Sequence, residues 1–216
     1  MELYNICLCM GRFQPFHWGH FDLVQAALAQ GEQVIILLGS HLSVPSIKNP
    51  WSSEEREKMI RMCISPTEQA RIQMLPIYDY ETNEQWASII HREVYTIACL
   101  SDRIAIAGHH DDGRKFFSQW FPDWNYVEKI RRPNLNATDI RIAYFGEAPE
   151  THYRDKLPPG TLQYLRKFKT QPNYRQFCQE FHARSRHNRD RGKPHDLPLP
   201  HHPACGSAPG GSQPNC

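Results

Sequence analysis

Short apolar runs alternate along the chain with longer segments in which apolar residues recur every three or four positions. The short runs are rich in β-branched residues and apolar on both faces, which is typical of strands in a parallel sheet covered by helices. They predict five strands, at residues 4–10, 33–39, 71–77, 103–108 and 125–130. The sequence therefore predicts an α/β fold built around a five-stranded parallel sheet.

The longer segments predict helices between and after these strands. Their ranges are 18–30, 53–64, 84–100, 113–120, 138–145, 158–168 and 171–184. The second helix has a clear start, because Ser52 and Glu55 have the spacing of a capping box. Since βαβ crossovers are right-handed, we expect a Rossmann-like doubly wound sheet with C-terminal helices and a ligand site at the carboxyl ends of the strands.

The composition changes sharply near Arg184. The remaining residues hold six of the 17 prolines and almost no periodic apolar positions. Such a segment buries too little apolar surface to offset the entropy of ordering it. We therefore predict one domain over residues 1–184 and a disordered Pro/Gly-rich tail over 185–216.

Charge and hydropathy exclude several classes of function. The formal net charge is only +2 over 216 residues, so nothing broad in the charge points to nucleic acid or an anionic membrane. The longest apolar run, residues 34–39, is far too short to span a bilayer. The seven cysteines include no CxxC pair, which favours buried free thiols over a zinc or disulfide site. We expect a soluble cytoplasmic protein.

Polar residues crowd the predicted loop between the first strand and the first helix, which reads GRFQPFHWGH over residues 11–20. His17 and His20 lie three residues apart at the helix N-terminus, where free N–H groups and the helix dipole favour an anion. Gly11 lets the backbone approach a ligand, and Gly19 leaves room beside the imidazoles. A nearby phosphate favours the charged, donating form of an imidazole. The loop therefore predicts a polyphosphate site.

The HxGH motif His17-Trp18-Gly19-His20 resembles that of the nucleotidyltransferase superfamily, and the longer GRFQPFHxGH form resembles that of nicotinamide mononucleotide (NMN) adenylyltransferases. Three further segments agree in sequence and order: residues 47–60 (IKNPWSSEEREKMI), 79–86 (DYETNEQW) and 134–145 (NLNATDIRIAYF). In the last, Thr138 and Arg141 stand at a second predicted helix start. A hydroxyl, backbone N–H groups and a guanidinium would there converge on one anion.

The resemblance implies a set of site residues. ATP would contact Gly11, Arg12, Phe13, His17, Gly19, His20, Thr138, Ile140 and Arg141. NMN would contact Lys48, Asn83, Trp86 and His109, with the indole of Trp86 stacked on the pyridinium ring. The catalytic residues would be His17, His20 and Arg141. Mg²⁺ would be bound through the ATP phosphates, without a metal site of the protein's own.

Within this family the chain looks like the N-terminal domain of enzymes that join an NMN adenylyltransferase to a Nudix hydrolase. No Nudix motif follows, so we expect no Nudix pyrophosphatase activity. Two positions depart from the family pattern: Asn136 stands in place of a Ser, and Asp111 stands where related loops often carry Lys. Asn136 should still cap its helix.

The implied reaction transfers AMP from ATP to NMN and forms NAD and pyrophosphate. Two alternatives stay open. Pantetheine-phosphate adenylyltransferase has a similar final motif but lacks the GRFQPF lead and the Asn-x-x-Trp segment. A non-catalytic pyridine-nucleotide sensor is disfavoured by the intact His17, His20, Thr138 and Arg141. The preference for amide or acid mononucleotide is not decided by the sequence. The resemblance implies a homo-oligomer.

Overall fold

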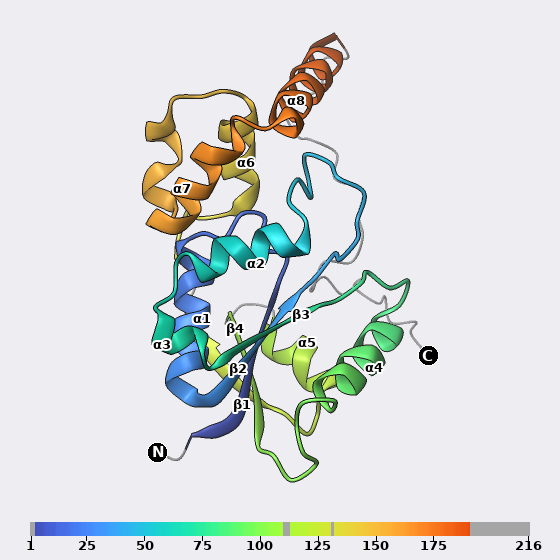
Figure 1. The fold of residues 1–216 in the computed structure, drawn as a ribbon. Coiled ribbons are helices and arrows are strands. Elements are labelled where there is room, and N and C mark those ends of the chain that lie inside the picture. Colours follow the sequence, from blue (N-terminus) through green and yellow to red (C-terminus); the bar gives the residue numbers. More distant parts are fainter. Residues whose placement is uncertain (1–2, 110–112, 131, 191–216) are drawn as a thin grey trace, which may run out of the picture.

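A computed structural model describes residues 3–109, 113–130 and 132–190 of the chain. Five parallel strands form one twisted sheet in the order β3-β2-β1-β4-β5 (Figure 1). The strands are β1 (Tyr4–Gly11), β2 (Gly31–Leu38), β3 (Ile72–Pro76), β4 (Ile104–His109) and β5 (Asn125–Lys129). The predicted parallel, doubly wound five-stranded sheet is confirmed.

Helices connect the strands and continue after the sheet. They are α1 (Trp18–Gln30), α2 (Ser53–Arg61), α3 (Pro66–Gln69), α4 (Asn83–Val94), α5 (Gly113–Trp120), α6 (Ala137–Phe145), α7 (Pro159–Phe168) and α8 (Pro172–Asp190), with 3₁₀ turns at Glu150–His152 and Arg154–Lys156. Among the described residues, no helix is both long and apolar enough to cross a bilayer.

The two faces of the sheet form two separate apolar cores. On β1, Cys7 and Cys9 face α1, α2 and the C-terminal helices, whereas Ile6 and Leu8 face α4 and the α5 region. This alternation follows from the period of two in a strand, and both sets are buried because helices cover both faces. The strands therefore read as continuous apolar runs, and their polar chemistry is confined to the carboxyl ends.

Several helices differ from the predicted ones, and the helix predicted over 53–64 ends at Arg61. The helix predicted over 84–100 ends at Val94, where the Thr96 hydroxyl donates to the carbonyl of Glu93 at 2.6 Å and competes with the helical backbone bond. The short α3 was not predicted, although Ser65 and Glu68 form a capping box before and within it.

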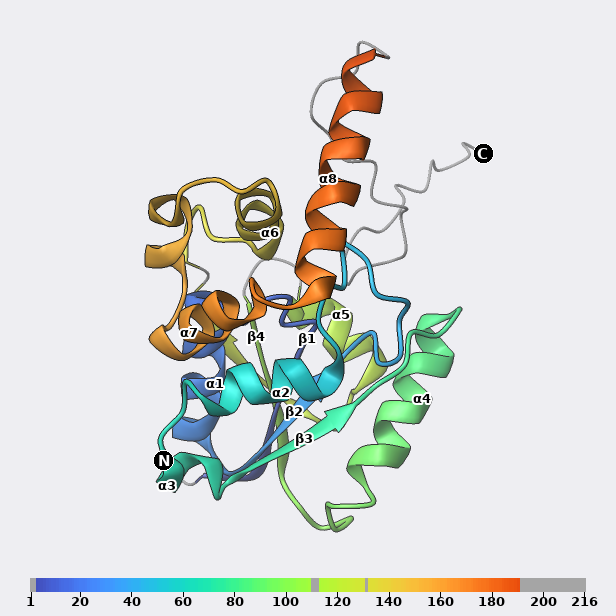
Figure 2. The ribbon, with the colours of Figure 1, turned by 45° about the horizontal axis from the view of Figure 1, so that its top comes forward.

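The last helix is longer than predicted. It ends at Asp190 rather than at residue 184, and its first half packs Tyr174 and Phe177 into the core. Its later turns extend away from the sheet (Figure 2). The rest of the predicted tail, residues 191–216, lies outside the described residues. Of the cysteines in the described part, Cys7, Cys9 and Cys178 are buried as expected, but Cys99 is exposed.

Candidate active site

Two adjoining cavities lie at the carboxyl ends of β1 and β4, where the strand order reverses and doubly wound sheets bind their ligands. One has a volume of about 440 Å³ and the other about 290 Å³. Both are lined by Met10, Arg12, Leu23 and His109, so they meet at these residues. Each is large enough for part of a nucleotide.

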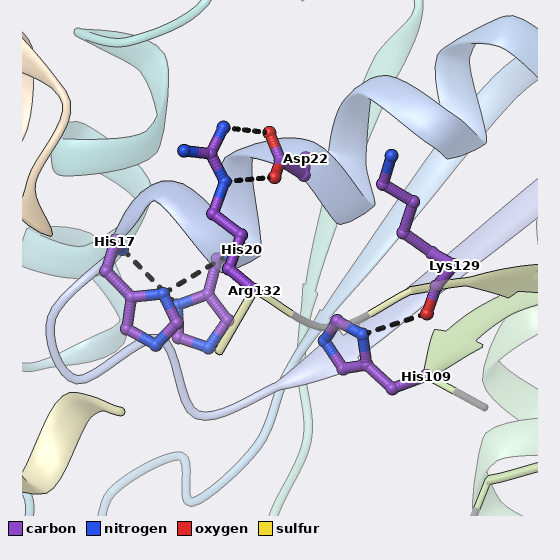
Figure 3. A network of polar contacts seen from close by, with 6 residues as sticks. All are labelled: His17, His20, Asp22, His109, Lys129 and Arg132. Atoms are coloured by element: carbon purple, nitrogen blue, oxygen red, sulfur yellow. Dashed lines mark hydrogen bonds and ion pairs between the residues drawn. The ribbon is translucent and has the colours of Figure 1, made fainter. Parts of the chain in front are cut away.

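His17 and His20 line the smaller cavity at the start of α1 and cap this helix with their side chains. The Nδ1 atom of His17 accepts the backbone N–H of His20 at 3.3 Å, and Nδ1 of His20 accepts the N–H of His17 at 3.4 Å. Their rings stack with centroids 3.7 Å apart (Figure 3). A Cβ atom on Gly19 would lie 3.1 Å from the His17 ring, which confirms that Gly19 provides room for an imidazole.

The surroundings of His20 disfavour its charged form. Burial lowers the pKa of His20 well below 6.5, and protonation of His17 or His109 would lower it further. The ring of Phe13 meets the His20 ring edge to face, with centroids 4.8 Å apart. In the absence of a ligand, His20 is therefore a neutral imidazole at physiological pH.

The other side of the smaller cavity is the start of α6. Asn136 caps this helix by accepting the N–H of Asp139 at 2.8 Å, as expected for the residue that replaces Ser. Arg141 is only 4% exposed and donates to the Thr138 hydroxyl at 3.2 Å and to the carbonyl of Gln14. Burial, with a smaller contribution from nearby Arg12, lowers the pKa of Arg141 to about 10. This guanidinium still carries its proton at pH 7.

In the part of the chain that the structure describes, no ion pair joins Arg141 to a carboxylate, and no Asp or Glu lines the smaller cavity. Arg12, at the junction of the two cavities, is likewise partly desolvated, which lowers its pKa. A buried positive charge without a counterion is costly, and an anionic ligand would compensate it. The electrostatics of the smaller cavity therefore fit a polyphosphate.

The larger cavity has an aromatic wall and polar groups at its rim. Trp86, in the first turn of α4, packs against Phe116 of α5 with ring centroids 5.9 Å apart. Asn83 is the first residue of α4, and His109 ends β4 and donates through Nδ1 to the carbonyl of Lys129 at 3.3 Å. Lys48 completes this set, and partial burial lowers its pKa. All four residues predicted to contact NMN line this one cavity.

Two predicted ATP contacts lie elsewhere. Gly11 is the last residue of β1 and lines the larger cavity rather than the smaller one. Ile140 is fully buried in the core and lines neither cavity. Arg12, Phe13, His17, Gly19, His20, Thr138 and Arg141 all line the smaller cavity. Asp111 lies outside the described residues.

Sequence reasoning missed two residues that shape the smaller cavity. Arg132 pairs with Asp22 of α1 through two hydrogen bonds, one of them 2.9 Å from Nη2 to Oδ1 (Figure 3). Its guanidinium also lies over the ring of Trp18. Gln14 is 2% exposed and exchanges two hydrogen bonds with the backbone of Trp51, at 2.8 and 3.2 Å. Gln14 stands within the polar motif of residues 11–20, but both contacts join residues far apart in sequence, so no local pattern signals the partners.

Comparison with known proteins agrees with this geometry. Residues 8–142 match the family described as cytidylyltransferase-like. A nicotinamide/nicotinic acid mononucleotide adenylyltransferase of Acinetobacter baylyi is 34% identical over 190 residues, which cover 87% of this chain and 99% of the relative. The chain belongs to the cytidylyltransferase-like family of nucleotidyltransferases, in the branch of the NMN adenylyltransferases.

Two solved structures from Francisella tularensis are also similar, both of a bifunctional NMN adenylyltransferase/ADP ribose pyrophosphatase. One is 30% identical with a TM-score of 0.77 and covers 87% of this chain and 56% of its own. The other, complexed with AMP and a Mn ion, is 28% identical with a TM-score of 0.78 and covers 93% and 58%. This chain thus spans little more than half the length of these bifunctional proteins. The resemblance drawn from the motifs is confirmed.

Proposed function

We propose that this chain transfers AMP from ATP to NMN, forming NAD and pyrophosphate. One observation carries the proposal: a cationic cavity built from two helix N-termini adjoins an aromatic cavity, and the two meet at Arg12 and His109. The cationic cavity suits the triphosphate of ATP, and the aromatic cavity suits a pyridinium ring. The names of its relatives support the same reaction.

The chemistry needs little beyond positioning and charge stabilisation. The 5′-phosphate of NMN has a second pKa of about 6, so it is largely a dianion at neutral pH and needs no general base. One of its oxygens forms a bond to the α-phosphorus of ATP, and the bond from that phosphorus to the bridging oxygen of the β-phosphate breaks. Pyrophosphate leaves with the bonding electrons. The protein holds the two phosphates in line and stabilises the charge that develops.

The residues at the two helix starts have separate roles in this scheme. His17 and His20 donate to the phosphates of ATP, with one of them reaching the α-phosphoryl oxygens. Thr138 and Arg141 hold the β- and γ-phosphates from the opposite side, and Arg12 lies between the two substrates. His17, His20, Thr138 and Arg141 are prepositioned by helix caps or buried hydrogen bonds, so little reorganisation is needed when charge moves.

A divalent cation would enter this site together with the nucleotide. Among the described residues, no Asp or Glu lines the smaller cavity, and no group of three or more His, Cys, Asp or Glu side chains could hold a metal. We propose Mg²⁺ bound through the ATP phosphates. When bound, the cation neutralises charge on the β- and γ-phosphates.

We further propose that the chain works in the cytoplasm, without nucleic acid or membrane, and that residues 1–184 form the adenylyltransferase domain. The low net charge supports the absence of nucleic acid and of anionic membranes as partners. Light scattering after size exclusion, with and without ATP, tests whether the chain forms a homo-oligomer.

Pyrophosphate release with ATP and Mg²⁺ tests the function, with NMN, nicotinate mononucleotide and 4′-phosphopantetheine compared as acceptors. Turnover with NMN supports the proposal, and the rate with nicotinate mononucleotide measures the preference between amide and acid. Turnover with phosphopantetheine alone would move the function to pantetheine-phosphate adenylyltransferase. Tight binding of NAD without any pyrophosphate release would instead identify a sensor.

A further inference from the structure

The reciprocal cap at the start of α1 restricts where His17 and His20 can carry a proton. In both rings Nδ1 is a hydrogen-bond acceptor for a backbone N–H, His17 from His20 at 3.3 Å and His20 from His17 at 3.4 Å. A ring nitrogen that accepts an N–H bond has no proton of its own. A neutral ring in this arrangement must therefore carry its proton on Nε2.

Packing prevents the rings from escaping this arrangement. The two imidazoles stack at an interplanar angle of 11°, and Phe13 and Phe16 lie 4.8 and 6.0 Å from the His20 centroid. Turning either ring over would put a C–H group where Nδ1 now accepts the backbone bond. Protonating Nδ1 would likewise set two N–H groups against each other and open the cap.

We propose that His17 and His20 act as a pair of neutral imidazoles, each fixed by the other's backbone amide as an Nε2–H donor. Each is then a positioning residue for its partner as well as a ligand for phosphate. The inference deepens the proposed function. The tautomers follow from the hydrogen bonds of the cap, and only the identity of the group that accepts the Nε2–H bonds, an ATP phosphate, rests on the proposed function.

The charges around the pair agree with two neutral rings. His109 from β4, Arg141 from α6, Arg132 from the loop before α6, and Arg12 from the loop after β1 line the same cavity and carry or can gain positive charge. The carboxylate of Asp22 on α1 is paired with Arg132 (Figure 3). Burial also lowers the pKa of His20, and a hydrogen bond with the carbonyl of Pro15 offsets part of this by holding the ring proton. The site thus supplies its positive charge through guanidinium groups, and the imidazoles supply directed N–H donors.

Nitrogen NMR on protein labelled at histidine tests the tautomers directly, without nucleotide and above pH 7. The chain has 12 histidines, so the signals of the pair are assigned from the spectra of His17→Asn and His20→Asn. We expect an unprotonated Nδ1 and a protonated Nε2 in both rings. An imidazolium, or an Nδ1–H tautomer in either ring, would overturn the proposal.

A matched pair of substitutions separates the cap from the donor. His17→Asn places an amide oxygen near the position of Nδ1 and keeps a favoured N-cap residue, but it has no group at the position of Nε2. His17→Gln reaches the position of Nε2 and lacks a good cap. We expect the melting temperature of His17→Asn to match the wild type and that of His17→Gln to fall by about 2–4 °C.

Turnover completes the test. With NMN and ATP, the rate of His17→Asn should fall on the order of 10²- to 10³-fold, although its fold and cap are intact. Equal melting temperatures for the two variants would contradict the capping role. The spectra report the tautomers, and the melting temperatures report the cap. Both are measured without substrate, so they test the proposal even if pyrophosphate release is absent. Absence of release in the wild type would count against the proposed function alone.

Discussion

Arg141 and Arg56 are two buried guanidinium groups with different surroundings, and the difference predicts opposite effects of removing them. Burial lowers the pKa of each to about 10. Arg56 donates to four backbone carbonyls, including those of Arg12 at 2.8 Å and Gly39 at 2.6 Å, and to the hydroxyl of Ser53. Arg141 has two such partners and lines the smaller cavity.

We expect Arg141→Met to lose activity and keep its stability. The substitution leaves the Gln14 carbonyl without its donor, which costs about 1–3 kcal/mol. It also removes a buried charge that no described carboxylate pairs with, and relief of that desolvation offsets a similar amount. The net change in the free energy of unfolding should be within about 1 kcal/mol. Loss of the phosphate donor should lower kcat/KM on the order of 10²- to 10³-fold.

Arg56→Met is the matched control, because it removes an equally buried guanidinium that binds only the protein. Several buried carbonyls then lack a donor, so we expect a loss of at least about 3 kcal/mol, or roughly 6–12 °C in melting temperature. Arg56 joins the loops after β1 and β2 to α2, which explains why its loss acts on the fold.

The assay is thermal unfolding with and without ATP, together with pyrophosphate release. Saturation at one hundred times Kd stabilises a binding-competent fold by about 2.7 kcal/mol. Arg56→Met should retain this shift from its lower baseline, whereas Arg141→Met should lose most of it. Near-normal turnover of Arg141→Met, or an ATP shift as large as that of Arg56→Met, would refute the reasoning.

Three further predictions concern the aromatic cavity, the glycines and pH. Trp86→Leu should raise KM for NMN about tenfold and leave KM for ATP unchanged, since only the pyridinium loses its stacking partner; equal changes in both would contradict this. Gly108→Ala should lower the free energy of unfolding in urea by about 1–3 kcal/mol, because its Cβ would lie 2.1 Å from the Tyr126 hydroxyl. For Gly39→Ala, whose Cβ would lie 3.7 Å from the nearest atom, the change should stay within about 0.5 kcal/mol. The pKa of His20 is lower in the folded chain than its ordinary 6.5, so the folded state binds fewer protons. The contribution of the neutral His20 ring to the free energy of unfolding should therefore be fully present above pH 6.5 and be lost as the pH falls below it, by at most about 1.4 kcal/mol per pH unit. The free energy of unfolding of His20→Asn in urea should depend less on pH.

The sequence by itself determined the elements and the helix starts of this protein. Strand runs, helix periods and the caps at Ser52 and Asn136 could be predicted because each depends on residues within one turn of each other. The same holds for His17 and His20, whose spacing places both at one helix start. Together with the order of the motifs, this was enough to predict the class of fold and the family.

Only the tertiary structure decided which polar residues serve the ligand and which serve the fold. Arg56 and Arg141 look alike in sequence, and the contrast between them follows from the carbonyls that the packed loops bring to Arg56. Ile140 lies in a motif that resembles a binding segment, yet the rotation of α6 turns its side chain into the core. The pairing of Arg132 with Asp22 joins segments 110 positions apart. Such contacts depend on strand order and crossover, which place distant residues together only after the chain has folded.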